Sequence, residues 1–165
     1  QIYSIALGGG MSSRLFQEVR EKRGLCYTIF AQAGAYSDTG MTTIYAGTSD
    51  AQIGELANIT IDELKRAADT LSQAELDRAR AQMKAGLLMG LESASNRAER
   101  LARMVQVWGK VPNLEETVAR IDAVNLDKLR TYAQSVASSA KMATALYGPI
   151  AAAPDLTALE ARRAA

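Results

Sequence analysis

Two stretches of alternating apolar and polar residues limit the folds open to this chain. Residues 25–36 and 41–48 both alternate with a period of two, which is typical of β-strands. The residues on the apolar side of the first stretch are Leu25, Tyr27, Ile29, Ala31 and Ala33. Asp38-Thr39-Gly40 between the two stretches predicts a turn. We therefore expect one antiparallel hairpin.

Helical periodicity precedes the hairpin. The opening residues are typical of the last turns of an amphipathic helix, which is expected to end at Gly8-Gly9-Gly10 because glycine tolerates the left-handed conformation of a helix C-terminus. A second helix is expected from a cap at Ser12 or Ser13 to Gly24. Its inward residues are Leu15, Phe16 and Val19.

Further helices are expected after the hairpin. Asp50 is a candidate cap for one of them, and Ser72-Gln73-Ala74-Glu75 is a capping box that predicts the start of a long helix. A break is expected near residues 92–95, followed by a helix that ends at Gly109. The residues of that helix expected to point inward are Ala98, Leu101, Val105 and Trp108. Two shorter helices are expected after the caps Asn113 and Asn125.

The order of these segments predicts an α+β fold, with helices on one face of a mostly antiparallel sheet. Residues 142–147 are expected to add a third strand, which Gly148-Pro149 would end. Residues 1–150 are expected to form a single domain, and the alanine-rich residues 151–165 a loosely attached tail. The first helix has no start signal and three strands are few, so we expect a strand and the start of that helix upstream of Gln1.

The composition excludes several classes of function. No histidine occurs in the chain, which rules out a Ser-His-Asp triad and a zinc site with histidine ligands. The net charge of +1 offers no electrostatic reason to expect nucleic acid or an anionic membrane as a partner. The single cysteine, Cys26, excludes an internal disulfide and a cysteine-cluster metal site.

One long segment and several shorter ones resemble a known family. Residues 7–27 read LGGGMSSRLFQEVREKRGLCY, residues 85–93 read AGLLMGLES, and residues 96–99 read NRAE. Together with the expected closing strand up to Gly148-Pro149, they resemble the second, non-zinc domain of the insulinase, pitrilysin and mitochondrial-processing-peptidase family of zinc metallopeptidases. The resemblance covers most of the chain up to about residue 150, and the absence of histidine agrees with it.

The resemblance implies a role for two residues. Family peptidases carry the zinc motif H-x-x-E-H in their first domain. In the second domain an arginine, and a tyrosine seven residues after it, reach the substrate near the zinc. Arg20 and Tyr27 keep this spacing. A phenol can donate to the oxyanion that forms during peptide hydrolysis, and a guanidinium can hold a substrate carbonyl. Arg20 and Tyr27 are therefore the candidate catalytic residues.

Simpler roles stay open for both residues. An arginine in the last turn of a helix can merely offset the helix dipole, and Tyr27 can be a core residue. Gly8-Gly9-Gly10 lacks the Lys-Ser/Thr of a phosphate-binding loop, so we interpret it as a chain break. Cys26 is expected to be a buried apolar residue rather than a nucleophile. Residues 92–99 are expected to form a solvated face with an internal Glu–Arg pair.

The expected function is that of the non-zinc half of a zinc endopeptidase, which binds extended peptide and assists hydrolysis at a zinc site on the missing N-terminal half. Zinc is thus the cofactor of the parent enzyme, and this chain alone is expected to be inactive. The expected partners are the zinc-bearing half, on the same chain or on a partner subunit, and the peptide substrate; a dimer stays open. A cytoplasmic location is expected, with the periplasm left open. The alternative is a structural or assembly subunit of the same family.

Overall fold

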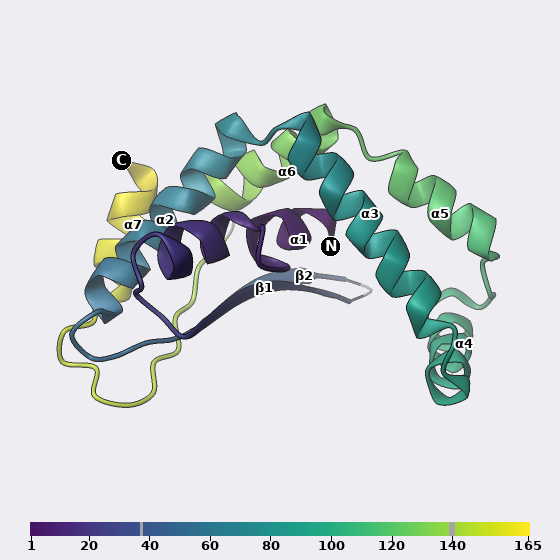
Figure 1. Ribbon diagram of the computed structural model, residues 1–165, viewed down its shortest axis with the longest axis horizontal. Helices are drawn as coiled ribbons and strands as arrows, with labels where there is room; N and C mark the ends of the chain where they lie inside the picture. The colour runs from purple at the N-terminus through teal and green to yellow at the C-terminus, as the bar shows by residue number, and fades with distance from the viewer. Residues whose placement is uncertain (37, 139–140) are drawn as a thin grey trace.

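The computed structural model describes residues 1–36, 38–138 and 141–165. Four helices lie on one side of an antiparallel hairpin (Figure 1): α1 (Ile2–Gly8), α2 (Ile53–Thr70), α3 (Gln73–Gly90) and α6 (Leu126–Ser138). The strands are β1 (Thr28–Ala35) and β2 (Gly40–Gly47). The other elements are the π-helix η1 (Phe16–Glu21) and the helices α4 (Ala94–Trp108), α5 (Leu114–Asp122) and α7 (Leu156–Ala164). The arrangement confirms the predicted α+β class.

The hairpin has a regular ladder, in which Thr28 pairs with Gly47 at one end and Ala35 with Gly40 at the other. Its inner face packs against α1. On its outer face Phe30 stacks on the cross-strand neighbour Tyr45, with ring centroids 5.2 Å apart. The hairpin was predicted correctly. The side chain of Tyr27, which was expected on the apolar face, instead lies before the strand and is 85% exposed.

The core lies between the hairpin and the helices. Its most deeply buried large side chains are Leu7, Leu15, Val19, Leu71 and Leu76. Burying one such side chain contributes about 1.5–3 kcal/mol. The chain thus joins α1, η1, α2 and α3 to the hairpin through one apolar cluster.

Gly8 marks the closest approach between α1 and β1. A Cβ atom at this position would lie 2.5 Å from the backbone nitrogen of Ala31 and 2.8 Å from its Cβ atom. The helix ends at Gly8, as predicted, but Gly9 has a φ of −89° and does not adopt the left-handed conformation. Gly8 therefore serves the contact between helix and strand rather than a left-handed turn.

The predicted boundaries of α3 and α4 depend on local capping. Ser72 and Glu75 form the predicted capping box, in which the Ser72 amide donates to Glu75 Oε2 at 2.9 Å. The expected break before α4 is also present, because Ser93 accepts a hydrogen bond from the Asn96 amide. Gly109 ends α4 with a φ of +67°. Each of these signals lies within a few residues of the helix end that it determines.

A network of ion pairs joins η1, α2 and α3. Arg14, just before η1, binds Glu75 through both carboxylate oxygens, at 2.6 and 2.9 Å. Burial acts to raise the pKa of Glu75, but hydrogen bonds from Arg14 and Ser72 outweigh it and hold the pKa at about 2. Glu18 pairs with Lys22 and Arg23, and these hydrogen bonds hold its pKa at about 2 as well.

The expected third strand is absent from the described part of the chain. Residues 142–147 run outside the sheet, which contains only β1 and β2 among the described residues. Met142 touches the core, whereas residues 143–147 are exposed. Strand formation requires a neighbour that pairs with the backbone N–H and C=O groups. The prediction of a strand at residues 142–147 was therefore wrong.

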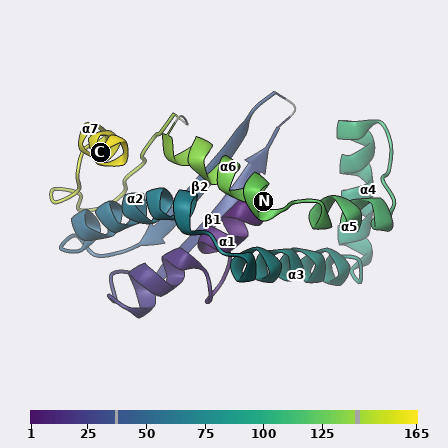
Figure 2. The same ribbon diagram turned by 90° about the horizontal axis from the view of Figure 1, so that it is seen from above.

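Two other expectations differ from the structure. The apolar residues of α4 do not point into a core: Leu101, Val105 and Trp108 are all exposed, and Figures 1 and 2 show α4 at the end of the molecule far from α7. Residues 156–164 form helix α7 rather than a loose tail. Leu159 is buried, and Arg162 binds Asp62 of α2 through two hydrogen bonds of 2.8 and 2.6 Å.

Among the described residues, none of the helices has both the length and the apolar character that a membrane crossing requires.

Replacing Gly8 with alanine should destabilise the fold by about 1–3 kcal/mol, because the new Cβ atom would push against the backbone of Ala31. Gly86→Ala is the matched control, since Gly86 lies in α3 and a Cβ atom there would have no neighbouring atom within 4 Å. That change should raise the free energy of unfolding by about 1 kcal/mol, because alanine favours the helix. Urea unfolding of both variants checks the prediction. Equal stabilities would contradict the close approach.

Replacing Glu75 with glutamine should lower the free energy of unfolding by about 1–3 kcal/mol at neutral pH, because the bond with Arg14 loses its charge. The pKa of Glu75 is depressed on folding, so its contribution is present above about pH 4.5 and is lost as the pH falls towards about 2. The difference between variant and wild type should close over this range. Urea unfolding at several pH values measures it. Glu92→Gln, at an exposed position, is the control and should show no such convergence.

Candidate functional site

The guanidinium of Arg20 lies close to two aromatic rings. Its guanidinium carbon is 4.6 Å from the ring centroid of Phe16, on the preceding turn of η1. It is 5.6 Å from the ring centroid of Tyr27, which directly precedes β1. Both distances fall within the range of cation–π contacts. The structure therefore brings together the two residues singled out from the sequence and adds Phe16 to them.

A turn at Gly24 places Tyr27 beside Arg20. Gly24 has a φ of +62°, and its amide donates to the Arg20 carbonyl at 3.0 Å. The amide of Leu25 donates to the Val19 carbonyl, also at 3.0 Å. These bonds end η1 and reverse the chain. Tyr27 then joins the hairpin through its amide, which donates to the Gly47 carbonyl at 3.1 Å.

Arg20 differs from the other cations around η1. Lys22, Arg23 and Arg66 all pair with Glu18. The nitrogen–oxygen distance is 2.8 Å for Arg23 and 3.4 Å for Arg66. The Arg20 guanidinium makes no hydrogen bond or ion pair within the described ranges of the chain. Its guanidinium carbon lies over the rings of Phe16 and Tyr27, and its N–H donors make no hydrogen bond to a described residue. The exposed hydroxyl of Tyr27 also lacks a hydrogen bond to any described residue.

The structure decides between some of the simpler roles considered above. A core position for Tyr27 is wrong, because the residue is exposed. Arg20 does lie in the last turn of η1, so an interaction with the helix dipole is retained. From the sequence, Phe16 was expected only on the apolar side of a helix. Its spacing of four residues from Arg20 is the signal that could have identified it.

Cys26, which directly precedes Tyr27, belongs to the buried core. Its thiol is buried, and burial raises its pKa, against a smaller opposing effect of the Arg20 charge. A raised pKa keeps the thiol protonated, and the thiolate is the nucleophilic form. The location favours the predicted role as a small buried residue.

A polar cavity of about 450 Å³ lies over the ion-pair network. Arg14, Glu18, Glu75 and Arg66 line it, and these residues are paired with one another or with their neighbours. Glu63 is buried, and burial raises its pKa against the opposing charge of Arg66, with which it pairs. The cavity is therefore lined by groups that neutralise each other.

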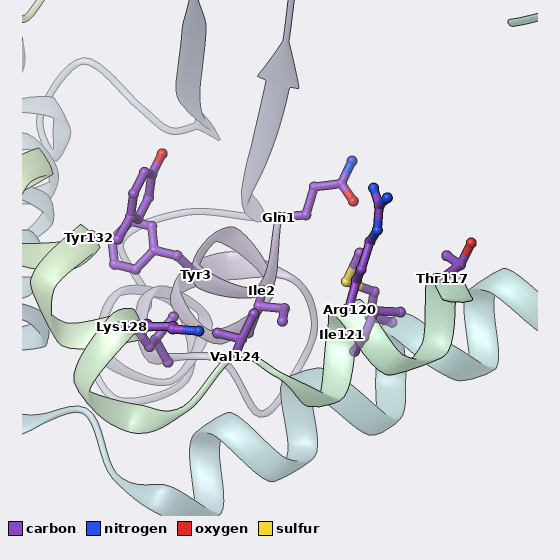
Figure 3. A pocket seen from close by; sticks show the side chains of 11 residues that line it. Gln1, Ile2, Tyr3, Thr117, Arg120, Ile121, Val124, Lys128 and Tyr132 are labelled. Atoms are coloured by element: carbon purple, nitrogen blue, oxygen red, sulfur yellow. The ribbon is translucent and has the colours of Figure 1, made fainter. Parts of the chain in front are cut away.

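A second cavity, of about 390 Å³, lies beside α1, α5 and α6 (Figure 3). Its lining is mostly apolar and includes Ile2, Ile121 and Val124. The hydroxyl of Tyr3 is buried without a partner in the described part of the structure, and burial raises the pKa of this phenol. Neither cavity contains Arg20 or Tyr27 in its lining.

The remaining polar candidates do not form a site. Residues 92–99 lie on an exposed face, as predicted, but no Glu–Arg ion pair joins them in the described part of the chain. Within the same part, no group of three or more acidic or cysteine side chains is placed to hold a metal ion.

Comparisons with known proteins agree on one family. The family model described as the peptidase M16 inactive domain matches residues 1–83. An uncharacterized zinc protease of Streptomyces coelicolor is 38% identical over 136 residues, which are 82% of this chain and 30% of that protein. The chain spans about a third of the length of the curated relatives that it matches.

Solved structures share the fold. A chain of Complex III2 from Candida albicans, solved with Inz-5 bound, has a TM-score of 0.72 at 23% identity, covering 81% of this chain and 34% of that one. A protease from Helicobacter pylori has a TM-score of 0.69 at 24% identity, covering 81% and 32%. At these identities the likeness concerns the fold.

Proposed function

The chain belongs to the peptidase M16 family, as its inactive domain, and from this premise we propose that it binds extended peptide and assists peptide hydrolysis. The reaction would take place at a zinc site on another part of the parent protein, either on the same chain or on a partner subunit. Arg20 and Tyr27 would contact the substrate. A cytoplasmic location is part of the same proposal.

The state of Arg20 is the observation that carries this proposal. Arg20 is half-buried, its guanidinium contacts two rings and it makes no hydrogen bond to a described residue, so its donors are available for a ligand. Planar guanidinium groups bind carbonyl and carboxylate oxygens with directed hydrogen bonds. A peptide presents such carbonyl oxygens along its whole length. Arg20 is therefore suited to hold one of them.

Tyr27 adds a neutral donor beside the cation. When a peptide carbonyl is attacked, negative charge develops on its oxygen, and a phenol at hydrogen-bond distance stabilises that charge. The Tyr27 side chain is exposed and lies next to Arg20, so one substrate can reach both groups. Arg20 would then bind and orient the peptide, and Tyr27 would stabilise the charge that forms.

Zinc does not fit the residues of this chain. The chain has no histidine, its one cysteine is buried, and the described residues contain no cluster of three candidate metal ligands. The relative from Streptomyces coelicolor is named a zinc protease and is about three times as long as the matched region. This supports a division in which the metal is held elsewhere in the parent protein.

In the full-length parent protein, Tyr27→Phe should lower kcat by about 10²–10³-fold, because the donor to the developing oxyanion is lost. Arg20→Ala should lower kcat/KM by about 10–100-fold through the loss of a charged hydrogen bond. Cleavage of a fluorogenic peptide measures both effects.

Two matched substitutions at exposed positions serve as controls. Tyr36→Phe removes another exposed hydroxyl, and Arg103→Ala removes an arginine on α4. Both variants should retain wild-type kinetics. Wild-type activity of the Arg20 and Tyr27 variants, in a protein that hydrolyses peptides, would refute the assisting role and favour a structural subunit instead.

A further inference from the structure

We propose that Phe16 is a positioning residue, which holds the guanidinium of Arg20 in the orientation that leaves its donors facing the ligand. This inference rests on the proposed function for its effect on activity. The contact itself does not depend on that function. The effect of Phe16 would be exerted entirely through Arg20.

The two rings around Arg20 are not equivalent. Tyr27 is almost fully exposed, and it is the more distant ring, at 5.6 Å. Phe16 is half-buried and lies closer, at 4.6 Å from the guanidinium carbon. An exposed side chain has freedom of rotation and restrains its neighbour weakly, whereas a half-buried ring is held by its surroundings. Phe16 is thus the firmer of the two contacts.

The geometry of η1 brings Phe16 and Arg20 together. The Lys22 amide donates to the Gln17 carbonyl at 3.0 Å, a bond between residues five apart that is typical of a π-helical turn. Val19 is fully buried and fixes the rotation of this turn about its axis. Phe16 and Arg20, four residues apart, then lie on the same side. Short π-helical turns occur frequently at functional sites.

One of the two acidic residues of η1, Glu18, already has cationic partners. Glu18 binds Lys22 and Arg23, which are the other two cations at this end of the helical segment. Arg20 therefore has no competing carboxylate from Glu18 in the structure, and its contacts are aromatic. Stacking restrains a guanidinium while its N–H donors stay unused, because the rings contact its faces and the donors lie at its edge. A salt bridge would restrain Arg20 equally well but would occupy those donors.

The experiment compares Phe16→Leu with Phe16→Tyr in the full-length parent protein. Leucine keeps an apolar side chain without a ring, and tyrosine keeps the ring. Selective labelling of arginine, with Arg20 assigned from the spectrum of Arg20→Lys, reports the contact directly by NMR. The Arg20 side-chain resonances should show a ring-current shift that Phe16→Leu abolishes and Phe16→Tyr retains. An unchanged shift in a folded Phe16→Leu protein would overturn the proposal.

Peptide cleavage gives the second measurement. Phe16→Leu should lower kcat/KM by about 3–10-fold, and Phe16→Tyr should restore it to within about twofold. In the Arg20→Ala background, Phe16→Leu should have no further effect. An equal loss in both backgrounds would show that Phe16 does not act through Arg20. Phe30→Leu, at the other phenylalanine of the chain, is the control and should show no coupling to Arg20→Ala.

The two measurements separate this inference from the proposed function. If Arg20→Ala leaves activity unchanged, the assisting role of Arg20 fails, while the NMR result still decides the contact with Phe16. If Arg20→Ala lowers activity and Phe16→Leu does not, the proposed function holds and the positioning role is wrong. Thermal unfolding identifies a variant that does not fold, and in that case Phe16→Tyr and Phe16→Trp, which keep a ring, should retain both the shift and the activity.

Discussion

The contact between Gly8 and Ala31 determines how the first third of the chain is arranged. It brings the end of α1 against the backbone of β1, at a distance that leaves no room for a side chain at Gly8. Between these two points the chain leaves the helix, forms η1, reverses at Gly24 and enters the strand. Because the contact between Gly8 and Ala31 fixes both ends of this segment, the position of η1 relative to β1 is restrained. The proximity of Arg20 to Tyr27 follows from that restraint.

Most of the cations around η1 pair with carboxylates, whereas Arg20 makes no ion pair with a described residue. Arg14 is used by Glu75, and Lys22, Arg23 and Arg66 converge on Glu18. Structural pairs of this kind hold η1, α2 and α3 together, and they also engage the Glu18 carboxylate, which does not pair with Arg20. An arginine whose only role was to offset a helix dipole would gain from any of these acidic partners. Within the described part of the chain, Arg20 instead contacts the rings of Phe16 and Tyr27, and its N–H donors make no hydrogen bond.

Local sequence signals were sufficient to predict the hairpin and several helix ends, whereas features that depend on contacts between distant residues were not predicted. The hairpin, the capping box of Ser72 and Glu75, and the end of α4 at Gly109 each depend on a few neighbouring residues, so the sequence pattern was sufficient to predict them. The strand expected at residues 142–147 would also require a partner strand, and nothing within the segment itself indicates whether one is present. Leu159 and Arg162 attach α7 to α2 through residues a hundred positions apart. The side on which Tyr27 lies is likewise set by the turn at Gly24.

If this domain binds substrate while another part of the parent protein holds the metal, the fold has to keep the substrate-binding side chains in fixed positions. If the metal lies on another part of the parent protein, substrate contacts from this chain are useful only when they are held at a fixed distance from it. An unrestrained arginine side chain samples many rotamers of similar energy, so it does not hold its guanidinium at a fixed position. Stacking against a half-buried ring reduces that freedom without occupying the donors. In a domain that supplies no metal ligand, catalytic assistance would then depend on rigidity, and the π-helical turn that joins Phe16 to Arg20 would be the element that provides it.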